Sequence, residues 1–196
     1  MAASERDGAW RAQFVADLAA VPPSDLLYLD ESGFQTNMTR TYARCPRGQR
    51  AIDTVPRSRG KNLTLLCALT LAGPTAPLAV EGGVNGHVFV AYVKRVLVPV
   101  LHPGHVVVLD NLGAHLRPKV RELIEATGAL LVYLSPYSPN LNPIEFTSSK
   151  LKAALRALAT RTREGVIDAL RLALDAVTPS DARGCFQHVL SLQLMR

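Results

Sequence analysis

The chain has 196 residues, 48% of them hydrophobic, and a net charge of +6. This length allows one domain with a substantial buried core. No apolar run approaches the roughly 20 residues of a membrane helix, and charged residues follow Met1 where a signal peptide would be apolar. Cys45, Cys67 and Cys185 lack the paired spacing of a zinc site or a disulfide framework. We therefore expect a soluble, cytosolic protein whose thiols are reduced and structural.

The excess positive charge is confined to one segment. Residues 40–61 carry seven cations and a single acid, Asp53, while basic and acidic residues balance in the rest of the chain. A concentrated cationic segment is typical of proteins that bind a polyanion, because each phosphate that it neutralises releases condensed counterions. Charge alone is equally consistent with a solvated loop of a basic protein.

The first half of the chain predicts one helix followed by strands. Apolar residues at helical spacing run up to Ala20 and stop at Pro22, so we assign residues 1–25 to a helical extension. Short apolar runs with β-forming residues, each closed by a turn signal, indicate strands. These strands are expected at residues 26–31, 41–43 and 62–70, with a further short strand at residues 77–81.

The second half of the chain alternates helices and strands. Apolar residues recur every three to four positions from Gly86 to Leu101, which predicts an amphipathic helix. The expected elements after it are a buried strand at 106–111, a helix at 118–127, a buried strand at 129–134, a long helix from Asn142 and one or two more helices. This order predicts an α/β domain over residues 26–196, with a mixed sheet and helices on both faces.

Two aspartates occupy equivalent positions in this pattern. Asp30 and Asp110 each lie at the carboxyl end of a strongly apolar strand, just before a turn. Ligands of α/β sheets collect at that edge, and two carboxylates brought together there repel each other unless a cation lies between them. Taken singly, each acid is more often a turn or cap residue. Their parallel placement favours a metal site.

A third acid, Glu145, lies near the start of the long helix. Asn142 three residues before it suits the N-cap, so spacing alone favours a capping box in which Glu145 is purely structural. A carboxylate in the first turn is also favoured by the helix dipole, and it can still project toward the strand ends. Both roles remain open at this point.

The motifs around these acids resemble a known family. LDESGF at Asp30, VVVLDNLGAH at Asp110 and LSPYSPNLNPIE ending at Glu145 closely resemble bacterial insertion-sequence transposases of the mariner-like superfamily, known as DDE endonucleases. The 34 residues between Asp110 and Glu145 match the separation associated with this group. The resemblance implies a ribonuclease-H-like fold with a mixed five-stranded sheet, with Asp30 on the first strand, Asp110 on the fourth and Glu145 on a following helix.

The resemblance also implies a chemistry and partners. Asp30, Asp110 and Glu145 would bind two Mg²⁺ or Mn²⁺ ions, for which carboxylate oxygens are suitable hard ligands, about 4 Å apart. The ions would support in-line attack on DNA by water or a 3′-hydroxyl. The expected partners are transposon ends and target DNA, together with a second copy of the chain in the active complex. The expected location is the cytoplasm of a bacterium, on the nucleoid when DNA is bound.

Basic residues near these motifs are candidate DNA contacts. They are Arg40, Arg44, Arg47, Arg57, Arg59, Lys61, His115, Lys150 and Lys152. A satisfied structural role is an equal alternative for His115, and a solvated basic helix face is an equal alternative for the two helix lysines.

Polar neighbours of the acids have separate expectations. Glu31 should lie on the opposite face of the strand from Asp30, as an ion-pair partner or structural acid. Asn111 is a further candidate for contact with phosphate. Three residues of the proline-rich loop before Glu145 are expected to shape its backbone, namely Ser135, Tyr137 and Ser138.

The sequence departs from the family pattern at three positions. Ser135 stands where a second proline is common, and Asn140 stands where an aspartate is common. Ser148 stands where an aromatic residue usually packs the helix onto the sheet, and Phe146 is the candidate to replace that packing.

The family's helix-turn-helix region for recognising transposon ends does not fit in the residues before the first strand. In bacterial relatives the two halves are often separate reading frames joined by frameshifting, so we expect an upstream partner or a fused region. Two alternatives stay open: a stand-alone nuclease of the same fold, and a catalytically idle remnant that binds DNA as a regulator.

Overall fold

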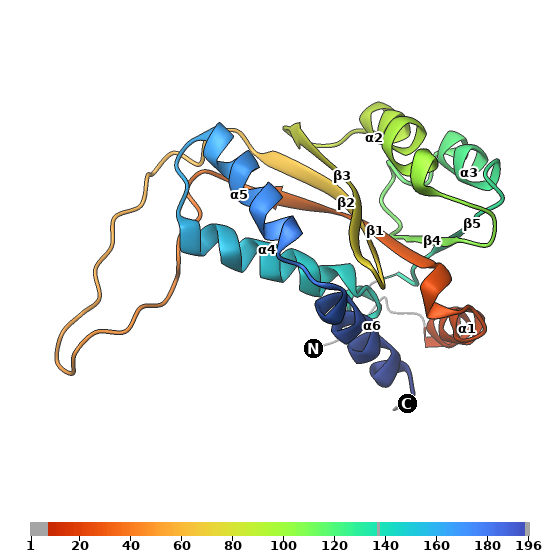
Figure 1. Cartoon of the computed structure of the whole chain (residues 1–196), viewed down its shortest axis with the longest axis horizontal. Coiled ribbons are helices and arrows are strands. Elements are labelled where there is room, and N and C mark those ends of the chain that lie inside the picture. The colour runs from red at the N-terminus through yellow and green to blue at the C-terminus, as the bar shows by residue number, and fades with distance from the viewer. Residues whose placement is uncertain (1–7, 137, 195–196) are drawn as a thin grey trace.

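The computed structural model describes residues 8–136 and 138–194, in which helices and strands alternate much as predicted. In chain order (Figure 1) the elements are α1 (Gly8–Ala19), β1 (Leu26–Phe34), β2 (Leu63–Thr70), β3 (Gly73–Glu81), α2 (Gly86–Tyr92), β4 (Val106–Leu109), α3 (Pro118–Glu125), β5 (Leu130–Tyr133), α4 (Ile144–Leu158), α5 (Arg163–Asp175) and α6 (Pro179–Leu194).

The five strands form one mixed sheet in the order β3-β2-β1-β4-β5. The first three strands are antiparallel neighbours, whereas β4 and β5 run parallel to β1. This change of direction follows from the connections, because parallel neighbours need a crossover, which helices α2 and α3 supply. The predicted mixed five-stranded sheet is therefore confirmed.

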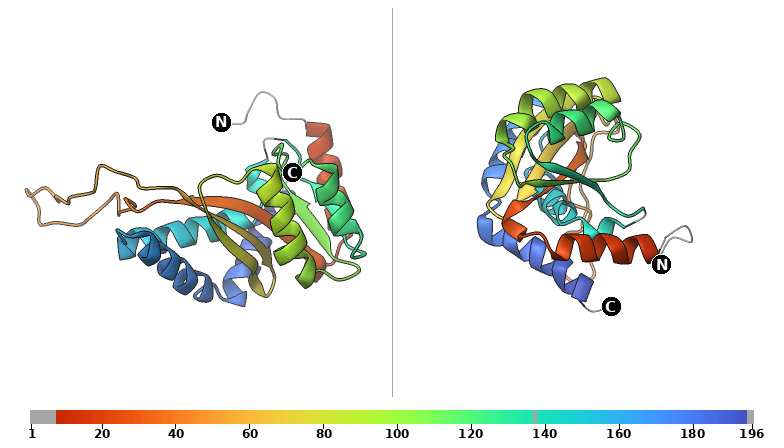
Figure 2. Two further views of the ribbon diagram at one scale, coloured as in Figure 1. Left: turned by 90° about the horizontal axis from the view of Figure 1, so that it is seen from above. Right: turned by 90° about the vertical axis from the view of Figure 1, so that its right-hand side faces the viewer.

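Helices cover both faces of the sheet (Figure 2). Successive side chains along the strands point alternately into two hydrophobic cores, one on each face. In β1, Leu26 and Tyr28 face the core shared with α1, α4, α5 and α6. Leu29 faces the opposite core, which is formed with α2 and α3. The central strands β2 and β4 alternate in the same way, so burial on both faces explains why their sequences are almost entirely apolar.

The segment between β1 and β2 corrects one prediction, because Thr41–Ala43 is not a strand. β1 pairs directly with β2, and residues 40–61 are exposed along their whole length. We call residues 35–62 the arm, because this segment projects from the body of the molecule (Figures 1 and 2). Thr41–Ala43 has no neighbouring strand in the described structure to satisfy its backbone groups, so its β propensity is not realised.

The helix predicted from Gly86 to Leu101 is less regular than expected. The Asn85 side chain caps α2, after which the chain makes a π-helical turn (Val93–Leu97) and a tight turn (Val98–Val100). Pro99 lies in that last turn and lacks the N–H that a continuing helix needs. No helix within the described ranges is both long and apolar enough to cross a membrane. The three cysteines are free, although Cys45 is exposed on the arm and is not the structural thiol that we predicted.

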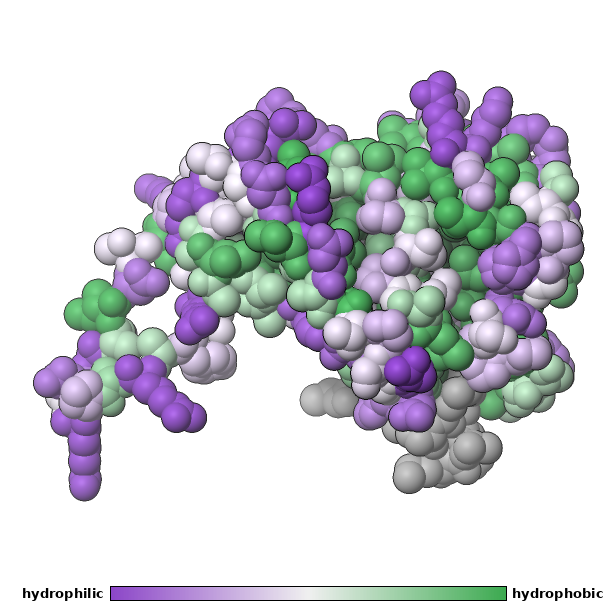
Figure 3. Space-filling model, in the orientation of Figure 1, coloured by the Kyte–Doolittle hydropathy of each residue, from purple (hydrophilic) through white to green (hydrophobic). Residues whose placement is uncertain are grey.

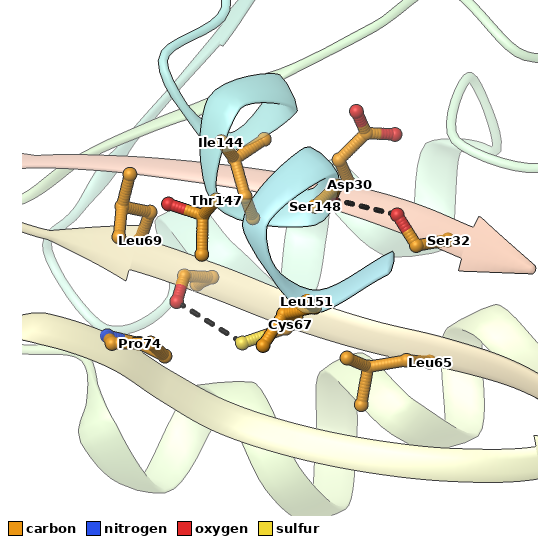
Figure 4. Close-up of a pocket in the computed structure, with 11 residues that line it drawn as sticks. Asp30, Ser32, Leu65, Cys67, Leu69, Pro74, Ile144, Thr147, Ser148 and Leu151 are labelled. Atoms are coloured by element: carbon orange, nitrogen blue, oxygen red, sulfur yellow. Dashed lines mark hydrogen bonds between the residues drawn. The ribbon is translucent and has the colours of Figure 1, made fainter. Parts of the chain in front are cut away.

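Helix α4 is joined to β1 by a buried hydrogen bond (Figure 4). Ser32 Oγ donates to Ser148 Oγ over 2.7 Å, and both side chains are buried. Ser148 thus contacts the sheet at the position where the family usually has an aromatic ring. Phe146 does not replace that ring, because it is 40% exposed and packs edge-on against His188. The small side chain instead lets α4 approach β1 closely enough for a polar contact.

This bond gives a test of how α4 is held. Ser148→Ala should destabilise the protein by about 1–2 kcal/mol, because it leaves the Ser32 hydroxyl buried without its acceptor. The double variant Ser32→Ala with Ser148→Ala should lose less than the sum of the two single variants, since no orphaned hydroxyl then remains. Urea unfolding of the four proteins measures this, and strictly additive losses would contradict the proposed coupling.

Candidate functional site

The sheet topology brings Asp30 and Asp110 together. The last parallel pair between β1 and β4 joins Tyr28 to Val108, and each aspartate follows two residues later in its own chain. Equal offsets from a shared register place both side chains at the same edge of the sheet. There they line a pocket of about 500 Å³.

Glu145 reaches the same pocket from a different element. It lies exposed in the first turn of α4, immediately after the proline-rich loop. Asn111 and Asn142 line the pocket as well. The three predicted acids therefore surround one space, but no three His, Cys, Asp or Glu side chains in residues 8–136 and 138–194 form a closed cluster able to hold an ion.

Asp30 is held by one hydrogen bond on each carboxylate oxygen. Its Oδ1 accepts from the backbone N–H of Glu31 over 2.7 Å, and its Oδ2 accepts from Asn142 Nδ2 over 3.0 Å. The pKa of Asp30 is raised to about 7, mainly by burial and also by the negative charges of Glu145 and Asp110, against the lowering effects of the Glu31 hydrogen bond and of His115. The acid is thus oriented by its neighbours but disfavoured as an anion.

Asn142 corrects the capping-box prediction. The first turn of α4 has no side-chain cap, and the buried Asn142 side chain turns toward Asp30. A hydrogen bond to a carboxylate is stronger than one between neutral groups, which gives the amide a better use than capping. Its Oδ1 is buried and has no hydrogen-bond partner among the described residues. Spacing alone predicted that Asn142 caps the helix, and only the fold shows that its side chain contacts Asp30 instead.

Asp110 has the opposite electrostatic environment from Asp30. Its Oδ1 accepts from the backbone N–H of Leu112 over 3.1 Å and lies 2.5 Å from His115 Nδ1. Burial raises the pKa of Asp110, but the hydrogen bonds from His115 and Leu112 outweigh it and hold that pKa below its ordinary value. Asp110 is therefore ionised at neutral pH.

His115 is not available for the DNA contact that we predicted, because its side chain is completely buried. Its Nε2 lies 3.3 Å from Glu31 Oε1, and its ring lies 4.1 Å from the Phe89 ring. Burial lowers the pKa of His115, but the hydrogen bonds to Asp110 and Glu31 outweigh this effect and raise it to about 9. The structural alternative for His115 is the one that its contacts support, and the expected ion-pair role of Glu31 is confirmed.

The loop that leads to Glu145 is fastened by its polar residues. Asn111 donates to the backbone oxygen of Leu134, so its side chain ties two loops together. Ser135 donates to Ser138 within the loop, as a shaping role requires, and Asn140 accepts from Arg11 of α1. Tyr137, the third residue predicted to shape this loop, lies outside the described residues.

The predicted basic residues divide into two groups. Those of the arm are exposed, and Lys61 pairs with Glu81 at its base. On α4, Lys150 pairs with Asp181 of α6 over 2.6 Å, and Lys152 is half-buried. Arg161, which the sequence did not single out, donates to the backbone oxygens of Thr36 and Met38 and so anchors the arm. The arm is hydrophilic over much of its surface (Figure 3).

Comparison with known proteins places most of the chain in one family. A family model described as "DDE superfamily endonuclease" matches residues 25–167, a range that contains all three acids. A search of curated proteins returns no match.

Solved structures of the Mos1 transposase share the fold. The catalytic domain of Mos1 mariner transposase has a TM-score of 0.71 at 14% identity, covering 99% of this chain and 93% of that one. A pre-cleavage Mos1 transpososome has a TM-score of 0.77 at 16% identity, covering 94% of this chain and 59% of that one. The Mos1 catalytic domain with Raltegravir and Mg has a TM-score of 0.68 at 14% identity, covering 94% and 88%. The fold is ribonuclease-H-like, as the resemblance implied.

The contrast between the two aspartates predicts opposite effects on stability. The folded-state pKa of Asp30 is raised, so the folded protein binds more protons than the unfolded chain between about pH 4 and 7, and stability falls as pH rises through this window. Asp30→Asn should therefore stabilise the protein by roughly 2–4 kcal/mol at pH 8, since one pKa unit is worth about 1.4 kcal/mol, and by almost nothing at pH 4. Urea unfolding in the presence of EDTA measures both values.

Asp110→Asn is the matched control. Its folded-state pKa is lowered, so its contribution is present above the ordinary aspartate pKa and is lost as pH falls. This variant should destabilise the protein at pH 8, because it removes the charged acceptor of a buried histidine. The same sign of change in both variants would contradict the electrostatic assignment.

Proposed function

Because the chain belongs to the DDE superfamily of endonucleases, we propose that it is the catalytic domain of a transposase that cuts and joins DNA strands with divalent metal ions. The observation that carries this proposal is the convergence of Asp30, Asp110 and Glu145 on one pocket. We assign residues 26–196 to that domain and residues 1–25 to a helical extension that precedes it.

The donor set fits Mg²⁺ or Mn²⁺. All three acids offer carboxylate oxygens, which are the ligands these hard cations prefer, and they surround a pocket large enough for hydrated ions. Asp30 and Asp110 would hold the ions at the sheet edge, and Glu145 would complete the second site. When bound, two ions would activate the attacking oxygen and stabilise the leaving oxygen of an in-line displacement. The Mos1 catalytic domain was solved with Mg.

The residues of the chain itself supply orientation. The Glu31 N–H and Asn142 hold Asp30, while the Leu112 N–H and His115 hold Asp110, so neither carboxylate is free to rotate away from the pocket. The fastened loop before α4 sets the position of Glu145. Fixed ligands matter because in-line transfer tolerates little misplacement of the reacting atoms.

The arm and α4 are the proposed DNA-binding surfaces. Most of their cations are exposed and suited to phosphate contacts, which position DNA without reading its sequence. The candidates that remain are Arg40, Arg44, Arg47, Arg57, Arg59, Lys61, Lys150 and Lys152.

The proposed partners reach beyond this chain, which spans about three fifths of the Mos1 chain in the transpososome. We propose a bacterial insertion-sequence origin, a homodimer in the active complex, and recognition of transposon ends by a helix-turn-helix region supplied upstream or by a separate frame.

The catalytic assignment has a direct test. Asp30→Ala, Asp110→Ala and Glu145→Ala should each lower Mn²⁺-dependent nicking of supercoiled DNA by at least about a hundredfold, because each removes a proposed metal ligand. Ser149→Ala, an exposed position on α4, is the control and should nick normally. DNA binding without any metal-dependent nicking by the unaltered chain would instead indicate an idle remnant, and nicking without strand transfer would indicate a stand-alone nuclease.

The arm has a separate test. Arg44→Ala with Arg47→Ala should weaken DNA binding. The negative slope of log affinity against log salt should become less steep by about 0.9 per lost phosphate contact. Lys94→Ala with Arg95→Ala removes the same charge from exposed positions after α2 and is the matched control. Fluorescence anisotropy titrations at several salt concentrations between about 50 and 200 mM measure the affinity and its salt slope for both double variants. Equal losses in the two double variants would rule out a specific role for the arm.

A further inference from the structure

We propose that Glu31 and His115 are positioning residues that fix the Asp110 carboxylate for metal binding, an inference that rests on the proposed function. Neither residue lines the pocket. They act through Asp110, from the side of the sheet that faces away from α4.

The two ring nitrogens of His115 reach two different carboxylates. Nδ1 lies 2.5 Å from Asp110 Oδ1, and Nε2 lies 3.3 Å from Glu31 Oε1. A ring held at both nitrogens cannot flip or tilt without breaking a hydrogen bond. The contact with the ring holds Asp110 Oδ1 in place. It thereby also sets the direction in which the other oxygen, Oδ2, points.

The rest of the surroundings of His115 is rigid. The Phe89 ring of α2 stacks against the imidazole, and the backbone N–H of His115 donates to Leu112 O over 2.8 Å. Tyr133 at the end of β5 donates its hydroxyl to the His115 backbone oxygen over 3.0 Å. The histidine is therefore fixed from α2, from its own loop and from β5, so it can serve as a fixed point for Asp110.

Glu31 connects this arrangement to the strand that carries Asp30. It follows Asp30 directly within β1, so the contacts from Glu31 to His115 and from His115 to Asp110 join β1, which carries Asp30, to the end of β4, which Asp110 follows. The spacing between the two proposed ligands then depends on these contacts as well as on the sheet. Hydrogen bonds from outside the ligand shell commonly change metal affinity tenfold to a hundredfold when they are removed.

The experiment compares two amide substitutions at one position. In His115→Asn the side-chain amide stands where Nδ1 was and can still donate to Asp110, whereas in His115→Gln it stands where Nε2 was and can donate only to Glu31. Both variants remove the ring and its stacking on Phe89, so both should lose similar stability. Only His115→Gln should lose Mn²⁺ affinity, by about tenfold or more, while His115→Asn stays within about threefold of the unaltered chain.

A second pair of variants tests the outer residue. Glu31→Ala leaves Nε2 without its acceptor and should weaken Mn²⁺ binding several-fold, on the order of fivefold. Glu31→Gln keeps a carbonyl acceptor and should restore most of the affinity. Calorimetric titration of the full chain with Mn²⁺ alone measures all four variants, and thermal melting without metal shows that each is folded.

The outcomes separate this inference from the function on which it rests. If the unaltered chain binds no Mn²⁺, the proposed function fails. If the unaltered chain binds Mn²⁺ and the folded Asn and Gln variants bind it equally well, or Glu31→Ala binds it as tightly as Glu31→Gln, then the metal site stands and the positioning role is overturned.

Discussion

The electrostatic repulsion among carboxylates gathered at one edge of the sheet is the constraint on which the rest of this structure depends. Asp30, Asp110 and Glu145 face one pocket, and their negative charges oppose one another. The two aspartates differ in how far their surroundings stabilise the negative charge. Asp110 is stabilised as an anion by His115 and by a backbone N–H, whereas burial and its acidic neighbours raise the pKa of Asp30 to about 7.

The geometry that creates this repulsion arises from the sheet. β1 pairs in parallel with β4 on one side and continues beyond that pairing as an antiparallel partner of β2. Asp30 therefore lies within a continuous strand, while Asp110 lies where its shorter strand has just ended. The first acid is held rigidly by strand pairing, and the second needs the side-chain contacts of His115 to hold it. The Ser32–Ser148 bond then brings the helix of Glu145 against the same strand.

The cationic arm is physically separate from the acidic pocket. Its charges are exposed and stand away from the body, so the pocket carboxylates are not simply neutralised by nearby arginines. Arg161 fixes only the base of the arm, through two backbone oxygens. This separation leaves the proposed DNA-binding surface of the arm distinct from the proposed catalytic pocket.

The sequence by itself determined the elements and the identity of the acids. Apolar strands with two buried faces, helical periodicity in α3 and α4, and the motifs around Asp30, Asp110 and Glu145 depend on local patterns that one chain displays directly. Two predictions were wrong because local sequence does not show which groups become neighbours in the fold. Thr41–Ala43 has β propensity but no partner strand, and Asn142 has the spacing of a cap but a carboxylate within reach.

Only the tertiary structure decided which groups meet across the fold. Glu31 and His115 are 84 positions apart, and no spacing rule links residues so distant along the chain. His115 was equally well explained as a DNA contact or as a structural residue, because a motif does not reveal burial. Hydrogen bonds and charge interactions act over a few ångströms of space, whereas sequence patterns report only separation along the chain. That difference is why the acids could be named from the sequence, whereas the contacts that orient them could not.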